Sequence, residues 1–436
     1  MKHSIIFFSL VFTSCAFVMS GCDLAQPKNR AQQSQLVDMG APLHEEVSLQ
    51  VEPEIIVARD LSLASGAERG ITSTPRIPPP IPAIDQILLR FYEKYQIPGG
   101  VSLAISRNGR LVYAGAVGYA DRNRTVKLTP EHRMRIASLS KPITAIAIMK
   151  LVEDRKLRLD DFVFGENGVF ENKYGMPTYR GRPVDIRVGH LLEHSAGGWG
   201  REANFSGIGI RLGTGMRPSD ITRVLEGLPL EHLPGTRSDH DTYSNFGYYV
   251  LGRIVEAKSG MSYENYVKEH ILRPSGIDGM RVGATRSGHD EVEYIATTGT
   301  NTNPFTFNNP AIIDSFGGWV ANPIELLQLL VRVDGFSNVP DILNRETIRI
   351  MTTPSRLNNR RALGWALNQT GNNWWHTGSM PGTSSQMARA SNGFNWVILV
   401  NYQPPSDVRS QFSTDMDNLF WEIHRTIRNW PAGTEL

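Results

Sequence analysis

The stretch SLSKPITAIAIMKLV, residues 138–152, is the part of the chain that most constrains the fold. From Ile143 to Val152 it is apolar on nearly every side of a helical projection, which predicts a helix buried inside a domain. Ser138 would then lie at the helix N-terminus, with Lys141 one turn on and on the same face. Pro142 fits the first helical turn, where its missing N–H is least costly. The pattern indicates either a nucleophile beside a base or a serine cap with a surface lysine.

An S-x-x-K string alone is expected about once by chance in a chain of this length, so neighbouring motifs matter. Tyr243-Ser-Asn245 follows a polar loop and precedes an apolar run, which places these side chains where a loop can deliver them into a cleft. Tyr263-Glu-Asn265 has the same Y-x-N pattern. It lies inside a helical pattern, however, and is interpreted as packing.

The third motif is His376-Thr377-Gly378, with Ser379 after it and two tryptophans before it. Its glycine is typical of an edge strand whose backbone is closely approached by a ligand. Lys258-Ser-Gly260 fits a related pattern, but it follows an apolar-periodic segment, and its glycine is typical of a helix C-terminal cap.

A competing chemistry comes from His190-Leu-Leu-Glu-His194, a literal H-x-x-E-H zinc pattern. A catalytic zinc would need a third protein ligand, and the sequence offers no evident one. No metal and no cofactor are therefore expected. The segment Gly382 to Gln386 misses the final glycine of a G-x-S-x-G elbow, so that alternative serine site is not predicted.

The ends of the folded part carry matching elements. Residues 83–95 have the apolar spacing of an amphipathic helix, and Asn108-Gly109 then joins two alternating runs as a hairpin. A second hairpin around Asn392-Gly393 precedes a helical segment from Asp407 to Arg428. This order predicts an α/β (α+β) fold, an antiparallel sheet flanked by terminal helices with an inserted helical lobe.

The first 22 residues are typical of an export signal, with Lys2 before an apolar stretch that ends near Cys22. Met19-Ser-Gly-Cys22 resembles a bacterial lipobox, which predicts lipidation of Cys22; the alternative is a plain cleaved signal. Cys15 is the only other cysteine and would leave with the signal, so no disulfide framework can form. We expect an exported lipoprotein anchored to a membrane, facing the periplasm or the cell exterior.

Residues 23–82 contain no aromatic side chain and end in a cluster of prolines, so they are predicted to form a flexible, proline-containing tether. The folded domain is expected over residues 83–430. The net charge is +2, from 45 Lys and Arg against 43 Asp and Glu. No basic stripe is visible, so nucleic acid is not an expected partner.

With S-x-x-K, Y-x-N and H-T-G in this order, the chain resembles the family of class C β-lactamases, D-alanyl-D-alanine carboxypeptidases and related esterases. The resemblance implies a β-lactamase/transpeptidase-like domain with its active site between sheet and lobe. It implies that Ser138 is acylated and that Lys141, as a neutral amine with a lowered pKa, takes its proton. Tyr243 would shuttle protons to the leaving group.

Substrate binding follows from the same resemblance. Asn245 would orient the substrate amide, and the backbone N–H groups of Ser138 and Ser379 would form the oxyanion hole. His376, Thr377 and Gly378 would line the substrate strand.

His376 stands where β-lactamases of this family usually carry lysine, and an imidazole is mostly neutral at neutral pH. This difference favours a peptidase or esterase, acting on a D-amino-acid peptide or an ester, over a β-lactamase acting on a β-lactam. A catalytically silent lipoprotein that binds peptidoglycan or a partner is the alternative from another class.

Overall fold

The computed structural model describes residues 76–199, 208, 210, 216–286, 288–296, 304–370 and 372–436. The predicted export signal, Cys22 and most of the predicted tether lie outside these residues. At the end of the predicted tether, Ile77 packs against the core, and the Arg76 carbonyl accepts a 2.6 Å hydrogen bond from Thr434 Oγ1. Among the helices of the described residues, none combines the length and the hydropathy that crossing a bilayer requires.

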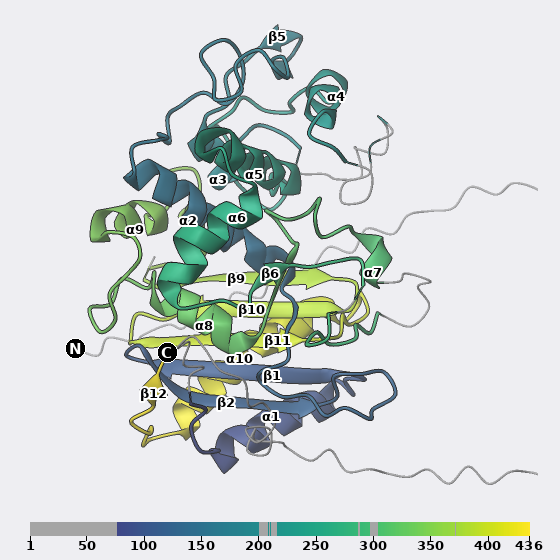
Figure 1. Cartoon of the computed structure of the whole chain (residues 1–436), viewed down its shortest axis with the longest axis vertical. Coiled ribbons are helices and arrows are strands. Elements are labelled where there is room, and N and C mark those ends of the chain that lie inside the picture. Colours follow the sequence, from purple (N-terminus) through teal and green to yellow (C-terminus); the bar gives the residue numbers. More distant parts are fainter. Residues whose placement is uncertain are drawn as a thin grey trace, which may run out of the picture. The chain divides into compact units, whose positions relative to one another are not determined.

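An antiparallel sheet joins the two ends of the folded part (Figure 1). Its strand order is β12-β2-β1-β11-β10-β9-β8, and β1 pairs with β11 from Val101↔Val400 to Arg107↔Phe394. The strands are β1 (Gly100–Arg107), β2 (Arg110–Gly118), β8 (Ala366–Leu367), β9 (Trp374–Met380), β10 (Thr383–Arg389), β11 (Phe394–Val400) and β12 (Thr434–Glu435). The domain was predicted to end near residue 430, whereas β12 adds an edge strand after that point.

Both predicted Asn-Gly turns close hairpins of this sheet. Asn108 has a φ of 51° and Gly109 a φ of 75°, the positive pair that a tight turn with the right twist requires. The Asn108 N–H donates a 2.8 Å hydrogen bond to the Gly393 carbonyl, so the two turns lie side by side. The hairpins from opposite ends of the chain are thereby joined in one sheet.

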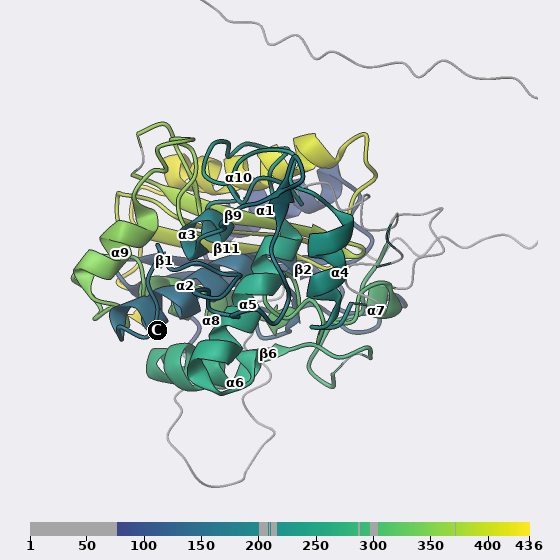
Figure 2. The ribbon, with the colours of Figure 1, turned by 90° about the horizontal axis from the view of Figure 1, so that it is seen from above.

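The two faces of the sheet bury different helices, because alternate strand residues point to opposite faces. Val101 and Ile105 pack in a core with α1 (Pro82–Lys94) and α10 (Arg409–Thr426), the two predicted terminal helices. Figure 2 shows these two helices together along one side of the sheet. Ala104 joins the core of the other face, which α8 (Pro323–Val331) covers.

The helical lobe stands on that second face (Figure 1). At its centre is α2 (Ser140–Glu153), whose residues from Ser140 to Met149 are all buried, as the apolar stretch predicted. The chain between β2 and β8 also forms α3 (Val188–Leu192), α4 (Asp220–Gly227), α5 (Asn245–Ser259), α6 (Tyr263–Val267), α7 (Pro304–Phe307) and α9 (Arg345–Thr352), with the short strands β3 (Met134–Arg135), β4 (Thr178–Tyr179), β5 (Arg182–Pro183), β6 (Arg281–Val282) and β7 (Trp319–Ala321). The predicted architecture of sheet, terminal helices and inserted lobe is confirmed.

Candidate active site

Ser138 lies in the 3₁₀ turn Ala137–Leu139, which leads directly into α2. Ala137 has a φ of 50°, a left-handed conformation that costs a residue with a side chain about 1–2 kcal/mol. Such a strained residue persists only where the surroundings hold it, and strained residues cluster at functional sites. Half-buried Ser138 is therefore presented at the start of a buried helix, the position that the sequence predicted.

Lys141 is fully buried, one turn after Ser138. Its Nζ lies 3.1 Å from Ser138 Oγ and 3.0 Å from the carbonyl oxygen of Phe316. It also lies 4.7 Å from the centre of the Tyr243 ring. A surface lysine beside a serine cap, the alternative in the sequence, is thus wrong. The contact gives Ser138 an amine within reach of its hydroxyl proton.

Tyr243 reaches the site from the loop that leads into α5, and Asn245 is the first residue of that helix. Ser244 between them is the N-cap of this helix, and its Oγ accepts a 2.9 Å hydrogen bond from the Gly247 N–H. Because the cap fixes the backbone at this point, half-buried Tyr243 is held on one side of the helix start and Asn245 becomes its first residue. The loop thus brings Tyr243 beside Lys141, as predicted, whereas a role of Asn245 in substrate binding stays a prediction.

His194, considered in the sequence as a zinc ligand, instead supports the Tyr243 loop. Its Nδ1 accepts a 3.0 Å hydrogen bond from the Ser244 N–H, and its ring lies 4.4 Å from that of Tyr243. Burial first, and then the nearby Arg361 and Lys141 charges, lower the pKa of His194 well below its usual value. A neutral ring can accept this backbone hydrogen bond, so His194 positions the loop.

The H-x-x-E-H string does not lie within one helix. α3 ends at Leu192, and His194 has a φ of 58°, so the string leaves the helix before its second histidine. His190 Nδ1 faces the Arg187 N–H, and Ser195 Oγ donates to Glu193. Among the residues that the structure describes, no group of three His, Cys, Asp or Glu side chains could hold a metal ion.

The two rival motifs, at Tyr263 and at Gly260, have structural roles. Tyr263 is fully buried, with its hydroxyl 2.6 Å from Thr144 Oγ1 and 3.2 Å from the Trp319 indole nitrogen. α5 ends at Ser259, and Gly260 caps it with a φ of 71°. Both interpretations, packing for Tyr263 and a helix end for Gly260, are confirmed.

His376 on β9 faces the same cluster. Its ring centre lies 6.4 Å from that of Tyr243, and its Nδ1 lies 2.7 Å from the Thr377 carbonyl oxygen. Burial, aided by the positive charges of Lys141 and Arg361, lowers the pKa of His376 to about 3. A neutral imidazole donates Nδ1–H to this carbonyl and keeps Nε2 as an acceptor. His376 therefore supplies no positive charge to a substrate.

Gly378 lets β9 approach the turn that carries Ser138. A Cβ atom at this position would lie 2.3 Å from Ser385 Oγ and 2.5 Å from the Ile136 carbonyl oxygen. Ser385 Oγ also donates a 2.8 Å hydrogen bond to that same carbonyl, which fixes the turn against the strands. The sequence predicted an edge strand approached by a ligand, but β8 pairs with the start of β9, and the group that lies close to Gly378 is the protein's own Ser138 turn.

We expect Gly378→Ala to lower the free energy of unfolding by about 1–3 kcal/mol and to slow hydrolysis, because β9 must move away from the Ser138 turn. Chemical denaturation and steady-state rates would measure both effects. Gly317→Ala is the matched control, since its added Cβ would meet only ordinary contacts at 3.4 and 3.6 Å. Equal stability and activity in both variants would contradict the close packing of β9 on this turn.

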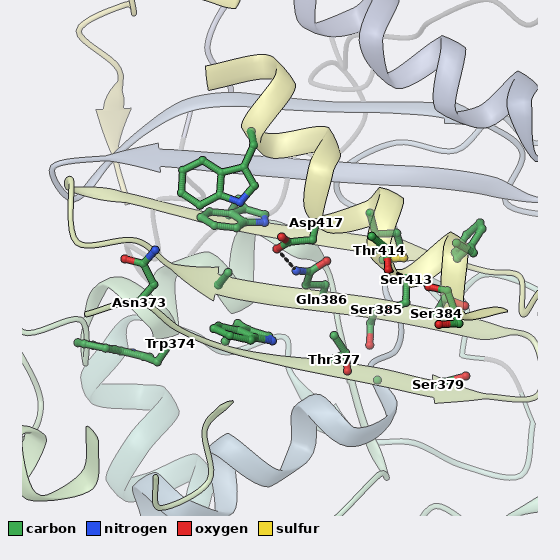
Figure 3. A pocket seen from close by; sticks show the side chains of 18 of the residues that line it. Asn373, Trp374, Thr377, Ser379, Ser384, Ser385, Gln386, Ser413, Thr414 and Asp417 are labelled. Carbon is green, nitrogen blue, oxygen red and sulfur yellow. Dashed lines mark hydrogen bonds between the residues drawn. The ribbon is translucent and has the colours of Figure 1, made fainter. Parts of the chain in front are cut away.

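Thr377 and Ser379 were predicted to bind substrate. Their side chains point into a crevice on the α10 side of the sheet (Figure 3), and Ser379 Oγ accepts a 2.8 Å hydrogen bond from Gln403 Nε2. The alternation of the strand puts His376 and Gly378 on the Ser138 side instead. The contribution of Thr377 and Ser379 to the site therefore falls to their backbone groups.

Arg361 is a member of the site that the motifs did not indicate. It lines a cavity of about 500 Å³ together with Tyr243, His194, His376 and Thr377. Its Cζ lies 5.8 Å from the Tyr243 ring centre, and its Nη2 donates a 2.8 Å hydrogen bond to the Asp239 carbonyl. Within the described ranges no carboxylate lies at ion-pair distance from Arg361. None of the motifs considered in the sequence includes this residue.

The Ser138 hydroxyl and the Lys141 amine lie beside the Tyr243 phenol, and Tyr243 shares a cavity with the Arg361 guanidinium. The beta-lactamase family model matches residues 84–416, which include all of these groups. Protein flp of Staphylococcus aureus (strain MW2) is 27% identical over 328 residues, 73% of this chain and 62% of that protein. The chain thus spans less than two thirds of the length of this relative.

Solved structures are similar over most of the domain. The octameric penicillin-binding protein homologue from Pyrococcus abyssi has a TM-score of 0.59 and 26% identity, and the match covers 77% of each chain. A D-amino acid amidase from Ochrobactrum anthropi SV3 has a TM-score of 0.63 and 20% identity, covering 80% of this chain and 99% of that one. At that identity the second likeness shows the fold alone.

Proposed function

The chain belongs to the beta-lactamase family, and from this premise we propose that it is a serine hydrolase acting through an acyl-enzyme on Ser138. We propose further that it is a carboxypeptidase-like enzyme for D-amino-acid peptides that end in a free carboxylate. The observation that carries the proposal is the 3.1 Å contact between Lys141 Nζ and Ser138 Oγ at the start of a buried helix.

In the proposed reaction, Ser138 Oγ attacks the carbonyl carbon of the scissile amide while its proton moves to Lys141. General base assistance of this kind contributes about a hundred- to ten-thousandfold. The negative oxygen that forms on the substrate would be held by the backbone N–H groups of Ser138 and Ser379. Gly378 supports this assignment, because it lets the strand lie against the Ser138 turn.

Tyr243 would then carry a proton to the leaving amine, so that the C–N bond breaks and the acyl group stays on Ser138. Its place beside Lys141, with His194 packed on its ring, supports this role. Water would hydrolyse the ester in a second step and restore the hydroxyl. Asn245, fixed at the start of α5, would orient the amide of the bound substrate.

The substrate class follows from the pair Arg361 and His376. A neutral His376 cannot attract a carboxylate, which by itself would favour an uncharged ester. Arg361 supplies the missing charge in the same cavity, from a guanidinium whose Nη2 binds only a neutral carbonyl. Arginine binds carboxylates with two parallel hydrogen bonds. The cavity therefore favours a carboxylate-terminated peptide over an uncharged ester.

The test is Arg361→Gln, assayed on N-acetyl-D-alanyl-D-alanine and on p-nitrophenyl acetate. A hydrogen bond to a charged group contributes about 1.5–3 kcal/mol, so we expect kcat/KM for the peptide to fall about 10- to 100-fold. The rate with the acetate ester should change little. Arg356→Gln is the matched control, because it removes the same charge from an exposed position of the same loop outside the cavity.

An equal fall on both substrates would mean that Arg361 holds the site together without recognising a carboxylate. Unchanged rates on both substrates would contradict a carboxylate-binding role of Arg361 and would favour an esterase. A wild type that prefers a penicillin to the peptide would favour a β-lactamase, since penicillins also carry a carboxylate.

A further inference from the structure

A second cavity, of about 730 Å³, lies between α10 and the strands β9 and β10 (Figure 3). It is on the face of the sheet opposite the helical lobe, so it is separate from the cavity that holds Arg361. The two cavities share Asn368, Trp375 and Thr377 in their linings and meet at the edge of β9. The catalytic groups Ser138, Lys141 and Tyr243 do not line this crevice, and the proposed reaction does not use it.

The register of three strands creates a slot between two indoles. Trp375 on β9 and Trp396 on β11 both pair with Ala388 on β10. The three side chains form one row on the same face, with the small alanine in the middle. Trp421 of α10 adds a third indole, its ring centre 5.5 Å from that of Trp396. Trp396 is buried and stacks on Phe420 with the ring centres 3.9 Å apart, so the flat apolar surfaces open to a ring-shaped ligand are those of the partly exposed Trp375 and Trp421.

Polar atoms at the base of the slot are left with unused hydrogen-bonding capacity. Gln386, 2% exposed, donates through Nε2 to Asp417 Oδ1 at 2.8 Å (Figure 3). Its Oε1 accepts from no group in the described part of the chain, and the indole nitrogen of Trp396, also 2% exposed, likewise donates to none there. One acceptor and one donor are thus available. A buried polar group without a hydrogen-bond partner costs free energy, so a ligand that bonds to both would be stabilised.

The charged side chains around the slot each have a hydrogen-bond partner. Asp417 accepts from Gln386 and from the Trp421 indole. Arg389 stacks at 3.9 Å on the Trp374 ring and binds the carbonyls of Asp334 and Asn372. Arg409 binds the Pro404 carbonyl. Among the described residues, Arg389 and Arg409 hydrogen-bond only to neutral carbonyls, so they keep their positive charges. The unused acceptor and donor at the base of the slot, however, are both neutral and match a neutral group on a ligand.

We propose that this crevice binds a saccharide unit that carries an acetamido group. The ring would stack its C–H face on the indole walls, and the acetamido group would supply one N–H donor and one carbonyl acceptor. Gln386 Oε1 is the matching acceptor and Trp396 Nε1 the matching donor. Hydroxyl side chains at the rim, among them Ser413 and Thr414 of α10, are available to the hydroxyls of the sugar (Figure 3).

The probe is chitotriose, three linked N-acetylglucosamine units, titrated into the folded protein by calorimetry. Cellotriose has the same linked rings without acetamido groups and is the ligand control. We expect saturable binding of chitotriose and at least about tenfold weaker binding of cellotriose, because the two buried hydrogen-bonding groups discriminate between them.

Two variants locate the site. Thr414→Trp blocks the crevice from an exposed position on α10, and Ala388→Leu fills the slot from its floor. Each should weaken chitotriose binding at least about tenfold. Thr426→Trp is the matched control, because Thr426 is exposed on the same helix and bonds the carbonyl four residues back, as Thr414 does. Hydrolysis of p-nitrophenyl acetate by each variant reports that the domain is folded.

Failure of chitotriose to bind at millimolar concentration would overturn the proposal. Equal affinity for cellotriose would overturn the acetamido assignment, and unchanged binding by Thr414→Trp would overturn the location. These binding results do not depend on whether the Ser138 site hydrolyses the peptide, so the two proposals can fail separately.

Discussion

Ser138→Ala is expected to lower kcat/KM at least about a thousandfold on peptide and ester alike, because no other group can take up the acyl chain. The loss should appear entirely as lost turnover, with the fold intact. Ser138 is half-buried, and its Oγ lies 3.1 Å from Lys141 Nζ, an amine that keeps its contact with the Phe316 carbonyl in the variant. The melting temperature should therefore change little.

Ser140→Ala is a demanding control for this experiment. Ser140 is fully buried in the next turn of the same segment, and its Oγ donates to the Ala137 carbonyl and accepts from the Trp319 N–H. We expect Ser140→Ala to cost stability while leaving a nucleophile in place, so that some turnover remains. If Ser138→Ala kept wild-type activity, the serine mechanism would be wrong. A wild type inactive on every substrate would favour a silent binding protein.

Lys141→Met is expected to reduce kcat/KM by about a hundred- to ten-thousandfold, because Ser138 loses the group that accepts its proton. Methionine nearly matches the length of lysine and tolerates the apolar surroundings of α2, so the variant should fold. Steady-state rates across pH would separate loss of the base from loss of binding, since KM should change less than kcat.

Lys150→Met controls for removing a positive charge from the same helix. Lys150 pairs with Asp154 at 2.7 Å near the C-terminal end of α2, far along the helix from Ser138. Its replacement should cost only about 0.2–0.5 kcal/mol of stability and no activity. A Lys141→Met enzyme as active as Lys150→Met would show that another group activates Ser138.

The terminal elements of the fold could be predicted because local sequence determines them. Asn108-Gly109 and Asn392-Gly393 specify turns, and the 3.6-residue spacing of residues 83–95 specifies α1. The pairing of β1 with β11 joins residues about 300 apart, and the local sequence does not specify it. β12 was missed because two paired residues carry no period that can be recognised.

The site was predictable where residues are adjacent in the chain. The spacing of Ser138 and Lys141 is one helical turn, so sequence alone could place them on one face. Arg361 and His194 could not be assigned in this way. Arg361 reaches Tyr243 through a loop 118 positions away, and His194 meets the Ser244 N–H across 50 positions. The sequence also showed no sign that α3 ends before the second histidine of the literal zinc pattern.

The most direct test is the mass of the intact protein during reaction with a slowly deacylating penicillin, followed by peptide mapping of any adduct. We predict a single addition equal to the whole inhibitor mass, located on the peptide that contains Ser138 and missing from Ser138→Ala. An adduct on another residue, or one that persists in Ser138→Ala, would contradict an acyl-enzyme on Ser138.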